Sequence, residues 1–285
     1  MCEKETISGL KSRLKEIKHV ALDMDGTIYK GTTLFPFTVG FLHDLKKMGI
    51  PYSFLTNNPT KSAADYLSKL KNMGIPATVN EIYTSSMAAI DYIRRSYPAV
   101  KRLFILGTPG MTGEFEAAGF LSVKDDAAEK PDGVVVAFDT TLTYSRLCRA
   151  AWWIAAGLPY IATNPDKVCP TDRQTILVDC GSICAALEKA TNRTPDVIIG
   201  KPAPRMLDGI MQRYGLKPHE IAMVGDRIYT DIVMAKNTHA MGVLVLTGET
   251  TPEDVKTSDV QPDVVANDLA GFGKMLMQAR NIKIN

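Results

Sequence analysis

The sequence is poor in the residues that mark disulfide-rich proteins and transition-metal sites. Its 285 residues include five cysteines and four histidines, and no two cysteines are spaced as CxxC. The cysteine count is odd, which does not fit a closed set of disulfides. Cys169, Cys180 and Cys184 are close enough in sequence to meet at one metal ion. The alternative, which we favour, is that they are reduced thiols, two of them on one helix face.

Long apolar runs and blocks of like charge are also missing. No stretch of about twenty apolar residues occurs, so we expect no membrane span. The first 18 residues are polar and contain no signal-peptide core, and we therefore expect a cytoplasmic protein. Lysines and arginines are interspersed with acids and the formal net charge is only +2, which gives no indication of a nucleic-acid partner.

The residues that are present indicate a globular α/β protein. The composition is 45% hydrophobic and 22% charged, and 285 residues suffice for one large domain or two ordinary ones. Residues 19–23 and 51–58 are typical of strands, while residues 37–49 and 62–74 show apolar positions at helical spacing. This β-α-β-α order predicts a Rossmann-like, doubly wound parallel sheet with helices on both faces.

The alternation continues far along the chain. We expect further strands at residues 102–107, 132–139, 159–164, 196–202, 220–226 and 241–249. We expect further helices at residues 144–157, 182–192, 204–215 and 230–239. These strands are too many for one simple sheet, so the sequence favours two α/β units.

Polar clusters follow the predicted strands at four places. They comprise Asp23 to Thr27, Thr56 to Asn58, Lys201, and Gly225 to Asp231. Ligands of an open parallel sheet bind outside the carboxyl ends of its strands, so we expect the four clusters to converge on one crevice. We therefore assign residues 1–84 and 191–285 to a core and residues 85–190 to an inserted α/β domain over the crevice.

The first and last clusters supply carboxylates. Asp23 and Asp25 end a buried strand, where a carboxylate has a desolvation cost that a cation offsets. Asp226 ends another strand, and no cluster of histidines or cysteines accompanies these acids. Such an oxygen-rich, negative site suits Mg²⁺, which takes few protein ligands and keeps water and phosphate oxygens. Taken alone, the DxD pattern is also often a capped turn.

The two middle clusters supply donors for an anion. The Thr56 hydroxyl and the Asn57 amide, with Asn58 beside them, can hold anionic oxygens without adding charge. The same residues also fit a turn that leads into a helix capped near Ser62. Lys201 is a compact positive charge suited to neutralising a carboxylate or phosphate, or it is an exposed lysine in a turn.

Asp231 and the residues around 165 have two interpretations each. Asp231 lies about where a predicted helix begins, so it either caps that helix or supports the metal site. Thr163 to Asp166 follow a strand of the predicted insertion, and Asn164 and Asp166 are our candidates for substrate contact. A tight Asn-Pro turn explains the same residues equally well.

The motifs DMDGT, LTNN, GKP and GDRIYTD, in this order, resemble the four motifs of the haloacid dehalogenase-like hydrolase superfamily. The insertion between the second and third motifs resembles a type 2 cap. The segments TNNPTKSAADYLSKLKNMGI, ATNPD and GKPAP resemble the NagD or p-nitrophenyl phosphatase-like branch. The resemblance runs from about residue 18 to residue 270, although residues 169–184 depart from the glycine-rich sequence usual in that branch.

The resemblance implies catalytic roles. Asp23 would be the nucleophile that forms an aspartyl-phosphate, and Asp25 would be the general acid and then the base that activates water. Thr56 and Asn57 would bind the phosphoryl group, and Lys201 would orient Asp23 and neutralise charge. Family members that cleave carbon–halogen bonds lack the second aspartate, so the presence of Asp25 favours a phosphatase.

The resemblance also implies a metal site. Asp226 would ligate Mg²⁺ together with Asp23 and the backbone carbonyl of Asp25. Asp231 would support the metal through water or through Lys201. Catalysis would then consist mostly of positioning and charge neutralisation, as phosphoryl transfer requires.

Together these implications predict a Mg²⁺-dependent hydrolase of small phosphomonoesters, such as sugar or nucleotide phosphates, with p-nitrophenyl phosphate as a surrogate. Its partner would be a small phosphorylated metabolite. One alternative is a phosphotransferase or mutase on the same core. Another is a non-catalytic phospholigand-binding protein, which the retention of the motif acids and Lys201 argues against.

A homodimer through the cap is a further expectation, because caps of this type often mediate dimers in the family. Trp152 and Trp153 are adjacent on a predicted cap helix, and adjacent helical positions face different directions. We therefore expect at least one of them near the surface, while a core position is equally plausible for the other.

Overall fold

The computed structural model describes residues 7–125, 129–169 and 174–282. The chain divides into two compact units. The first comprises residues 1–55, 68–82 and 207–285, and the second comprises residues 56–67 and 83–206. Each unit has its own parallel sheet and its own helices, which confirms the predicted α/β class. The cap boundaries predicted from the sequence, residues 85 and 190, stay a prediction.

The first unit is built on a six-stranded sheet with the order β15-β14-β13-β1-β4-β5. Its strands are β1 His19–Asp23, β4 Tyr52–Thr56, β5 Ile82–Thr84, β13 Ile221–Gly225, β14 Met241–Val245 and β15 Val264–Ala266. A short antiparallel hairpin, β2 Tyr29–Lys30 with β3 Thr33–Leu34, follows β1. Strand β1 pairs in parallel with both β13 and β4, and β13 pairs in parallel with β14. The carboxyl ends of these four strands therefore meet at one edge of the sheet.

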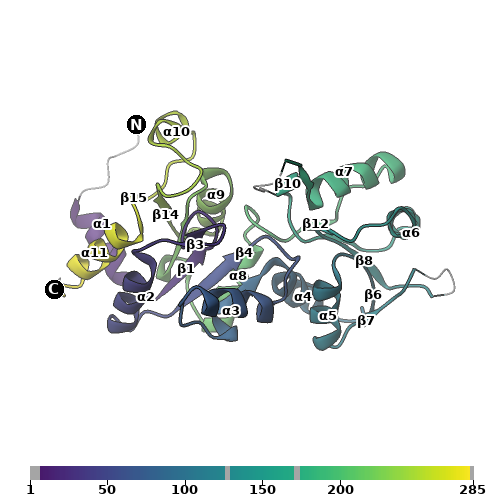
Figure 1. Cartoon of the computed structure of the whole chain (residues 1–285), viewed down its shortest axis with the longest axis horizontal. Helices are drawn as coiled ribbons and strands as arrows, with labels where there is room; N and C mark the ends of the chain where they lie inside the picture. The colour runs from purple at the N-terminus through teal and green to yellow at the C-terminus, as the bar shows by residue number, and fades with distance from the viewer. Residues whose placement is uncertain (1–6, 126–128, 170–173, 283–285) are drawn as a thin grey trace. The chain divides into compact units, whose positions relative to one another are not determined.

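The helices of the first unit are α1 Ile7–Glu16, α2 Thr38–Lys47, α9 Val233–Thr238, α10 Pro252–Thr257 and α11 Leu269–Ala279. Helices α3 Ala63–Asn72 and α8 Arg205–Tyr214 each cross a boundary between the units. Short helical turns lie at Val79–Glu81 and Pro218–Glu220, and a π-helical turn lies at Ile228–Ile232. Helix α11 lies beside both α1 and α2 (Figure 1), where Phe272 packs against Phe41 with ring centroids 6.0 Å apart.

The central strands of the first unit are buried on both faces. Every residue of β1, β4, β13 and β14 is buried, as expected for parallel strands covered by helices. Because the strand interiors are almost entirely apolar, their chemistry is confined to the residues at their carboxyl ends. In the described part of the chain, no helix is long and apolar enough to cross a membrane.

The second unit is built on a five-stranded parallel sheet with the order β12-β9-β8-β6-β7. Its strands are β6 Arg102–Leu106, β7 Leu121–Ser122, β8 Gly133–Val136, β9 Tyr160–Ala162 and β12 Val197–Ile198. An antiparallel hairpin joins β10 Val168–Cys169 to β11 Leu177–Val178. The helices are α4 Ser85–Ser96, α5 Pro109–Ala117, α6 Tyr144–Ala155 and α7 Cys180–Thr191. Helices α6 and α7 cover one face of the sheet, and α4 and α5 lie on the other (Figure 1).

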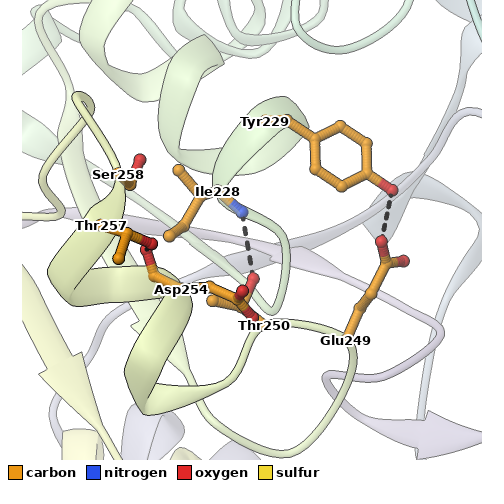
Figure 2. A pocket seen from close by; sticks show the side chains of 7 residues that line it. All are labelled: Ile228, Tyr229, Glu249, Thr250, Asp254, Thr257 and Ser258. Carbon is orange, nitrogen blue, oxygen red and sulfur yellow. Dashed lines mark hydrogen bonds between the residues drawn. The ribbon is translucent and has the colours of Figure 1, made fainter.

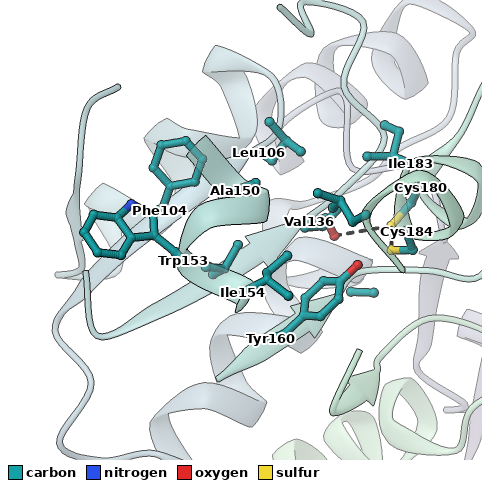
Figure 3. Packing of buried hydrophobic residues seen from close by; sticks show 13 residues of the cluster. Phe104, Leu106, Val136, Ala150, Trp153, Ile154, Tyr160, Cys180, Ile183 and Cys184 are labelled. Carbon is teal, nitrogen blue, oxygen red and sulfur yellow. Dashed lines mark hydrogen bonds between the residues drawn. The ribbon is translucent and has the colours of Figure 1, made fainter. Parts of the chain in front are cut away.

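Helices α6 and α7 hold the hydrophobic core of the second unit (Figure 3). Ile154 of α6 and Ile183 of α7 pack there against Val136 of β8 and other strand residues. Trp153 belongs to this core and is 8% exposed, whereas Trp152 is 64% exposed, which confirms that at least one of the two lies at the surface.

The described cysteines of the second unit form no disulfide bonds with one another. Cys180 and Cys184 lie in the same core with their sulfur atoms 3.9 Å apart. Among the described residues, the group that could hold a metal ion contains no cysteine. Cys2 and residues 170–173, which were considered in the sequence, lie outside the described residues.

His19 is a buried imidazole at the start of β1. Its Nε2 lies 3.0 Å from the Ser53 hydroxyl, and its ring lies 4.5 Å from the Tyr214 ring. Burial lowers the pKa of His19 from 6.5 to about 4. The unfolded chain therefore binds a proton at a higher pH than the folded chain does. The stability contributed by the neutral imidazole is complete above pH 6.5 and is lost as the pH falls toward 4.

We expect the free energy of unfolding to fall by roughly 2 kcal/mol between pH 7 and pH 5 because of His19 alone. His19→Gln should remove this part of the pH dependence, since it removes the titrating group. Urea unfolding of both proteins at the two pH values measures the difference. His43→Gln, at an exposed position of α2, is the matched control and should keep the wild-type dependence. An undiminished loss in His19→Gln would contradict the prediction.

Candidate active site

Two neighbouring strands bring the acids of the first and last motifs together. The register of β1 and β13 pairs Leu22 with Val224, so the next step brings Asp23 level with the end of β13. Asp226 follows that end directly, and Asp231 lies in the π-helical turn that comes next. One carboxylate oxygen from each of Asp23, Asp226 and Asp231 lies within 4.8 Å of the others. We call these three residues the acid group.

The acid group is buried, and its carboxylates repel one another. Asp23 is 8% exposed, Asp226 1% and Asp231 0%. Two unit charges 4.8 Å apart repel each other by roughly 3 kcal/mol at an effective dielectric constant of about 20. Burial raises the pKa of Asp226 to about 7, and the negative charges of Asp23 and Asp231 act in the same direction. A set of oxygen ligands with this excess of negative charge fits Mg²⁺.

The loop after β14 closes over the acid group. The Glu249 N–H donates to Asp226 Oδ2 at 2.7 Å, and the Thr250 N–H donates to the Asp226 carbonyl at 3.1 Å. The Thr247 hydroxyl donates to the Gly26 carbonyl at 2.6 Å, which ties the loop to the first motif as well. Both the orientation of the Asp226 carboxylate and the path of its backbone are therefore fixed by this loop.

The side chain of Glu249 also connects the loop after β14 to Tyr229 of the π-helical turn (Figure 2). Tyr229 donates its hydroxyl to Glu249 Oε1 at 2.9 Å, and Arg227 Nε lies 2.9 Å from Glu249 Oε2. The Ile228 N–H donates to the Thr250 hydroxyl at 3.3 Å. These residues border a cavity of about 350 Å³ lined by Ile228, Tyr229, Glu249, Thr250, Asp254, Thr257 and Ser258.

Two glycines make room for the Asp226 carboxylate. Gly26 has a φ of +88°, and a Cβ at this position would lie 2.5 Å from Asp226 Oδ2. A Cβ on Gly248 would overlap the Asp226 carboxylate. Neither position tolerates a side chain in this arrangement, because the backbone itself is packed against the acid. This loop is not among the residues predicted from the sequence, although the polar residues TGET follow the apolar part of a predicted strand there.

Asp25 is placed differently from the acid group. Its side chain is exposed, and its carboxylate is not a member of the group. The turn that carries it is closed by the Gly26 N–H, which donates to the Tyr29 carbonyl at 2.7 Å, and by the Ile28 N–H, which donates to the Met24 carbonyl at 2.9 Å. A carboxyl group in this position can exchange protons with a ligand or with water, while the role predicted for its backbone carbonyl stays a prediction.

The donor residues of the second and third motifs lie in the second unit, where Asn57 and Lys201 are bonded to each other. The Lys201 N–H donates to Asn57 Oδ1 at 2.8 Å, and Asn57 Nδ2 donates to the Lys201 carbonyl at 3.0 Å. Lys201 is 4% exposed, so the alternative of an exposed turn lysine is wrong.

The predicted turn and helix cap around Ser62 are confirmed. The Asn58 N–H donates to the Thr56 hydroxyl at 3.2 Å, and the Thr60 N–H donates to Asn58 Oδ1 at 2.9 Å. Ser62 accepts a bond from the Asp65 N–H at 3.2 Å and so caps α3. The phosphate-binding role of Thr56, Asn57 and Asn58 stays a prediction.

Asn164 and Asp166 belong to a network of amides and carboxylates. Asp166 Oδ2 accepts from Asn57 Nδ2 at 2.9 Å and from Asn164 Nδ2 at 3.0 Å. Asn164 Nδ2 also donates to Asp179 Oδ1 at 3.0 Å. Burial raises the pKa of Asp179 to about 6, although the bonds from Asn164 and the Cys180 N–H lower it. The predicted substrate-contact residues are therefore linked through these bonds to the second and third motifs.

We expect Gly248→Ala to weaken the acid group, because the added methyl group displaces the Asp226 carboxylate. The stability loss should be about 1–3 kcal/mol, and Mg²⁺ should bind roughly tenfold or more weakly. Urea unfolding and isothermal titration of Mg²⁺ measure the two effects. Gly113→Ala is the matched control, because its Cβ meets nothing within 4 Å and Gly113 lies in α5. Wild-type affinity in Gly248→Ala would count against this geometry.

Comparison with known families agrees with the motifs at both ends of the chain. Residues 20–121 match a profile described as "Haloacid dehalogenase-like hydrolase", and residues 198–272 match a second one described as "HAD-hyrolase-like". The first match contains the DMDGT and LTNN motifs, and the second contains GKP and GDRIYTD.

Similar proteins cover almost the whole chain. The acid sugar phosphatase of Staphylococcus aureus strain USA300 is 35% identical over 256 residues, which are 90% of this chain and 96% of that protein. The crystal structure of 4-nitrophenylphosphatase from Thermotoga maritima is 41% identical, with a TM-score of 0.86, over 92% of this chain and 98% of that one. A magnesium complex of glycerol phosphate phosphatase from Mycobacterium tuberculosis is 29% identical, with a TM-score of 0.83, over 92% of this chain and 78% of that one. The chain belongs to the haloacid dehalogenase-like hydrolase superfamily, in its NagD and p-nitrophenyl phosphatase-like branch.

Proposed function

We propose that this chain is a Mg²⁺-dependent phosphatase that hydrolyses small phosphomonoesters through an aspartyl-phosphate on Asp23. The observation that carries the proposal is the buried acid group at the ends of β1 and β13. A bound cation would offset the repulsion between carboxylates this close, and Asp23 is both a member of the group and the first residue of the DMDGT motif. The names of the similar proteins, each a phosphatase, support the same reaction class.

The reaction would proceed in two balanced steps. An Asp23 oxygen attacks phosphorus and the bond to the ester oxygen breaks, while Asp25 gives that oxygen its proton. Asp25, now ionised, then takes a proton from a water molecule, whose oxygen attacks phosphorus and releases Asp23 and inorganic phosphate. The exposed side chain of Asp25 suits this exchange of protons, since it is outside the acid group.

Asp23, Asp226 and the backbone carbonyl of Asp25 would hold the magnesium ion, and Asp231 would support it. When bound, Mg²⁺ neutralises charge on the phosphoryl group and holds that group in place. The Glu249 N–H keeps one oxygen of Asp226 occupied, so the carboxylate has a single orientation before any ligand arrives. Preorganisation of this kind reduces the cost of reaching the reactive geometry.

The donor residues would act on the phosphoryl group and on the nucleophile. Thr56 would contact the phosphoryl group through its hydroxyl and Asn57 through its main-chain N–H, because the Asn57 amide hydrogens already have acceptors. Lys201 would orient Asp23 and neutralise charge. Asn164 and Asp166 would select among substrates, which we expect to be small phosphorylated metabolites such as sugar or nucleotide phosphates.

Phosphate release from a panel of sugar phosphates, nucleotide phosphates and p-nitrophenyl phosphate, with and without Mg²⁺, tests the proposal. We expect Mg²⁺-dependent release that falls about a thousandfold or more in Asp23→Asn, because that variant lacks the nucleophile. Asp259→Asn, at an exposed position, is the matched control and should keep wild-type turnover.

Absence of release from every ester by folded wild-type protein with Mg²⁺ would refute a general phosphatase. Transfer of phosphate to an added alcohol in preference to water would instead indicate a phosphotransferase. Equal turnover by wild type and Asp23→Asn would refute the covalent route.

A further inference from the structure

The Asn57 side chain binds the Lys201 peptide at two points. Its Oδ1 accepts the Lys201 N–H at 2.8 Å and its Nδ2 donates to the Lys201 carbonyl at 3.0 Å, across 144 positions of sequence. The side-chain amide accepts the backbone N–H and donates to the backbone carbonyl of the same residue. This pair of hydrogen bonds fixes the orientation of that backbone, as pairing with a neighbouring strand would. The Lys201 side chain emerges from a backbone held in this way.

The second hydrogen of the same amide has a charged acceptor. Asn57 Nδ2 donates to Asp166 Oδ2 at 2.9 Å, and a hydrogen bond to a carboxylate is stronger than one between neutral groups. Asp166 Oδ2 is shared with Asn164 Nδ2, which is bonded in turn to Asp179. An unbroken series of hydrogen bonds therefore joins the segment after β9 to Lys201.

The packing around Asn57 leaves little room for another arrangement. A Cβ on Gly200 would lie 2.6 Å from Asn57 Oδ1 and 2.7 Å from the Thr163 carbonyl. The Gly200 N–H donates to the same carbonyl at 2.8 Å, and the Ser85 hydroxyl donates to the Asn57 carbonyl at 2.7 Å. Hydrogen bonds therefore fix both the backbone and the side chain of Asn57.

We propose that Asn57 is a positioning residue that sets the backbone of Lys201, and that the Asn57–Asp166 bond couples the substrate-selecting segment 163–166 to this lysine. The inference rests on the proposed function, in which Lys201 acts on the nucleophile. It differs from the role predicted from the sequence, because the side-chain amide acts on Lys201 and Asp166 rather than on the phosphoryl group. The phosphoryl group then meets Asn57 only through its backbone.

Exchange of the two side chains tests the coupling. Asn57→Asp keeps an acceptor for the Lys201 N–H, but it loses both donated bonds and sets a second carboxylate against Asp166. We expect kcat for p-nitrophenyl phosphate to fall about 100-fold, since a small misplacement of catalytic groups is that costly. The double variant Asn57→Asp with Asp166→Asn restores one donor–acceptor pair and the wild-type net charge. It should regain about tenfold or more of the lost kcat.

The double variant also separates this role from direct phosphate binding. If the Asn57 amide bound the phosphoryl group, Asp at position 57 would repel phosphate in both variants, KM would rise in both, and Asp166→Asn would give no rescue. The midpoint temperature of thermal unfolding reports on the Asn57–Asp166 contact independently of catalysis. We expect this midpoint to fall in Asn57→Asp and to recover in the double variant.

Activity of the wild type distinguishes the two proposals. A wild type that hydrolyses no ester counts against the proposed function and against a catalytic purpose for the Asn57–Lys201 contact. An active wild type whose Asn57→Asp variant is not rescued, in kcat or in thermal midpoint, overturns the coupling alone.

Discussion

The mutual repulsion of Asp23, Asp226 and Asp231 is the constraint on which the first unit depends. Their carboxylates are buried within 4.8 Å of one another, and such an arrangement persists only if the fold over-determines it. Parallel pairing of β1 with β13 supplies the strand ends, and the loop after β14 supplies a backbone N–H to Asp226. The burial that makes the group costly is also what would strengthen its attraction for a cation.

In the second unit, the polar residues of the second and third motifs and of segment 163–166 are linked by hydrogen bonds. Asn57, Asn164 and Asp166 form most of their bonds with one another and with the Lys201 backbone, so these buried and half-buried polar groups are satisfied within the unit. Such a network is sensitive to any change in one member, because each lost partner leaves a buried group unpaired. This sensitivity is what allows a change at Asp166 to reach Lys201 through a single amide.

Much of the fold and part of the site follow from the sequence alone. The apolar runs before Asp23 and Gly225 predicted two buried parallel strands, and helical geometry predicted that at least one of Trp152 and Trp153 lies near the surface. The hydrogen-bond partners of Asn57 could not be predicted from the sequence, because one of them, Lys201, lies 144 positions away and no local pattern encodes such a contact. Glu249 was missed for a similar reason: the contribution that matters is its backbone N–H, which every residue except proline carries. Asp25 and Asp23 are two residues apart, yet only the fold shows that one is exposed and the other buried.

Anomalous diffraction from crystals grown with Mn²⁺ in place of Mg²⁺ tests the central claim most directly, because Mn²⁺ favours the same oxygen ligands. The account predicts one strong anomalous peak within bonding distance of carboxylate oxygens of Asp23 and Asp226. It also predicts that the peak disappears from crystals of Asp226→Asn grown in the same way. Saturating Mn²⁺ that leaves no peak at these carboxylates in the wild type would contradict the account, since the acid group would then persist without the cation that it is inferred to hold.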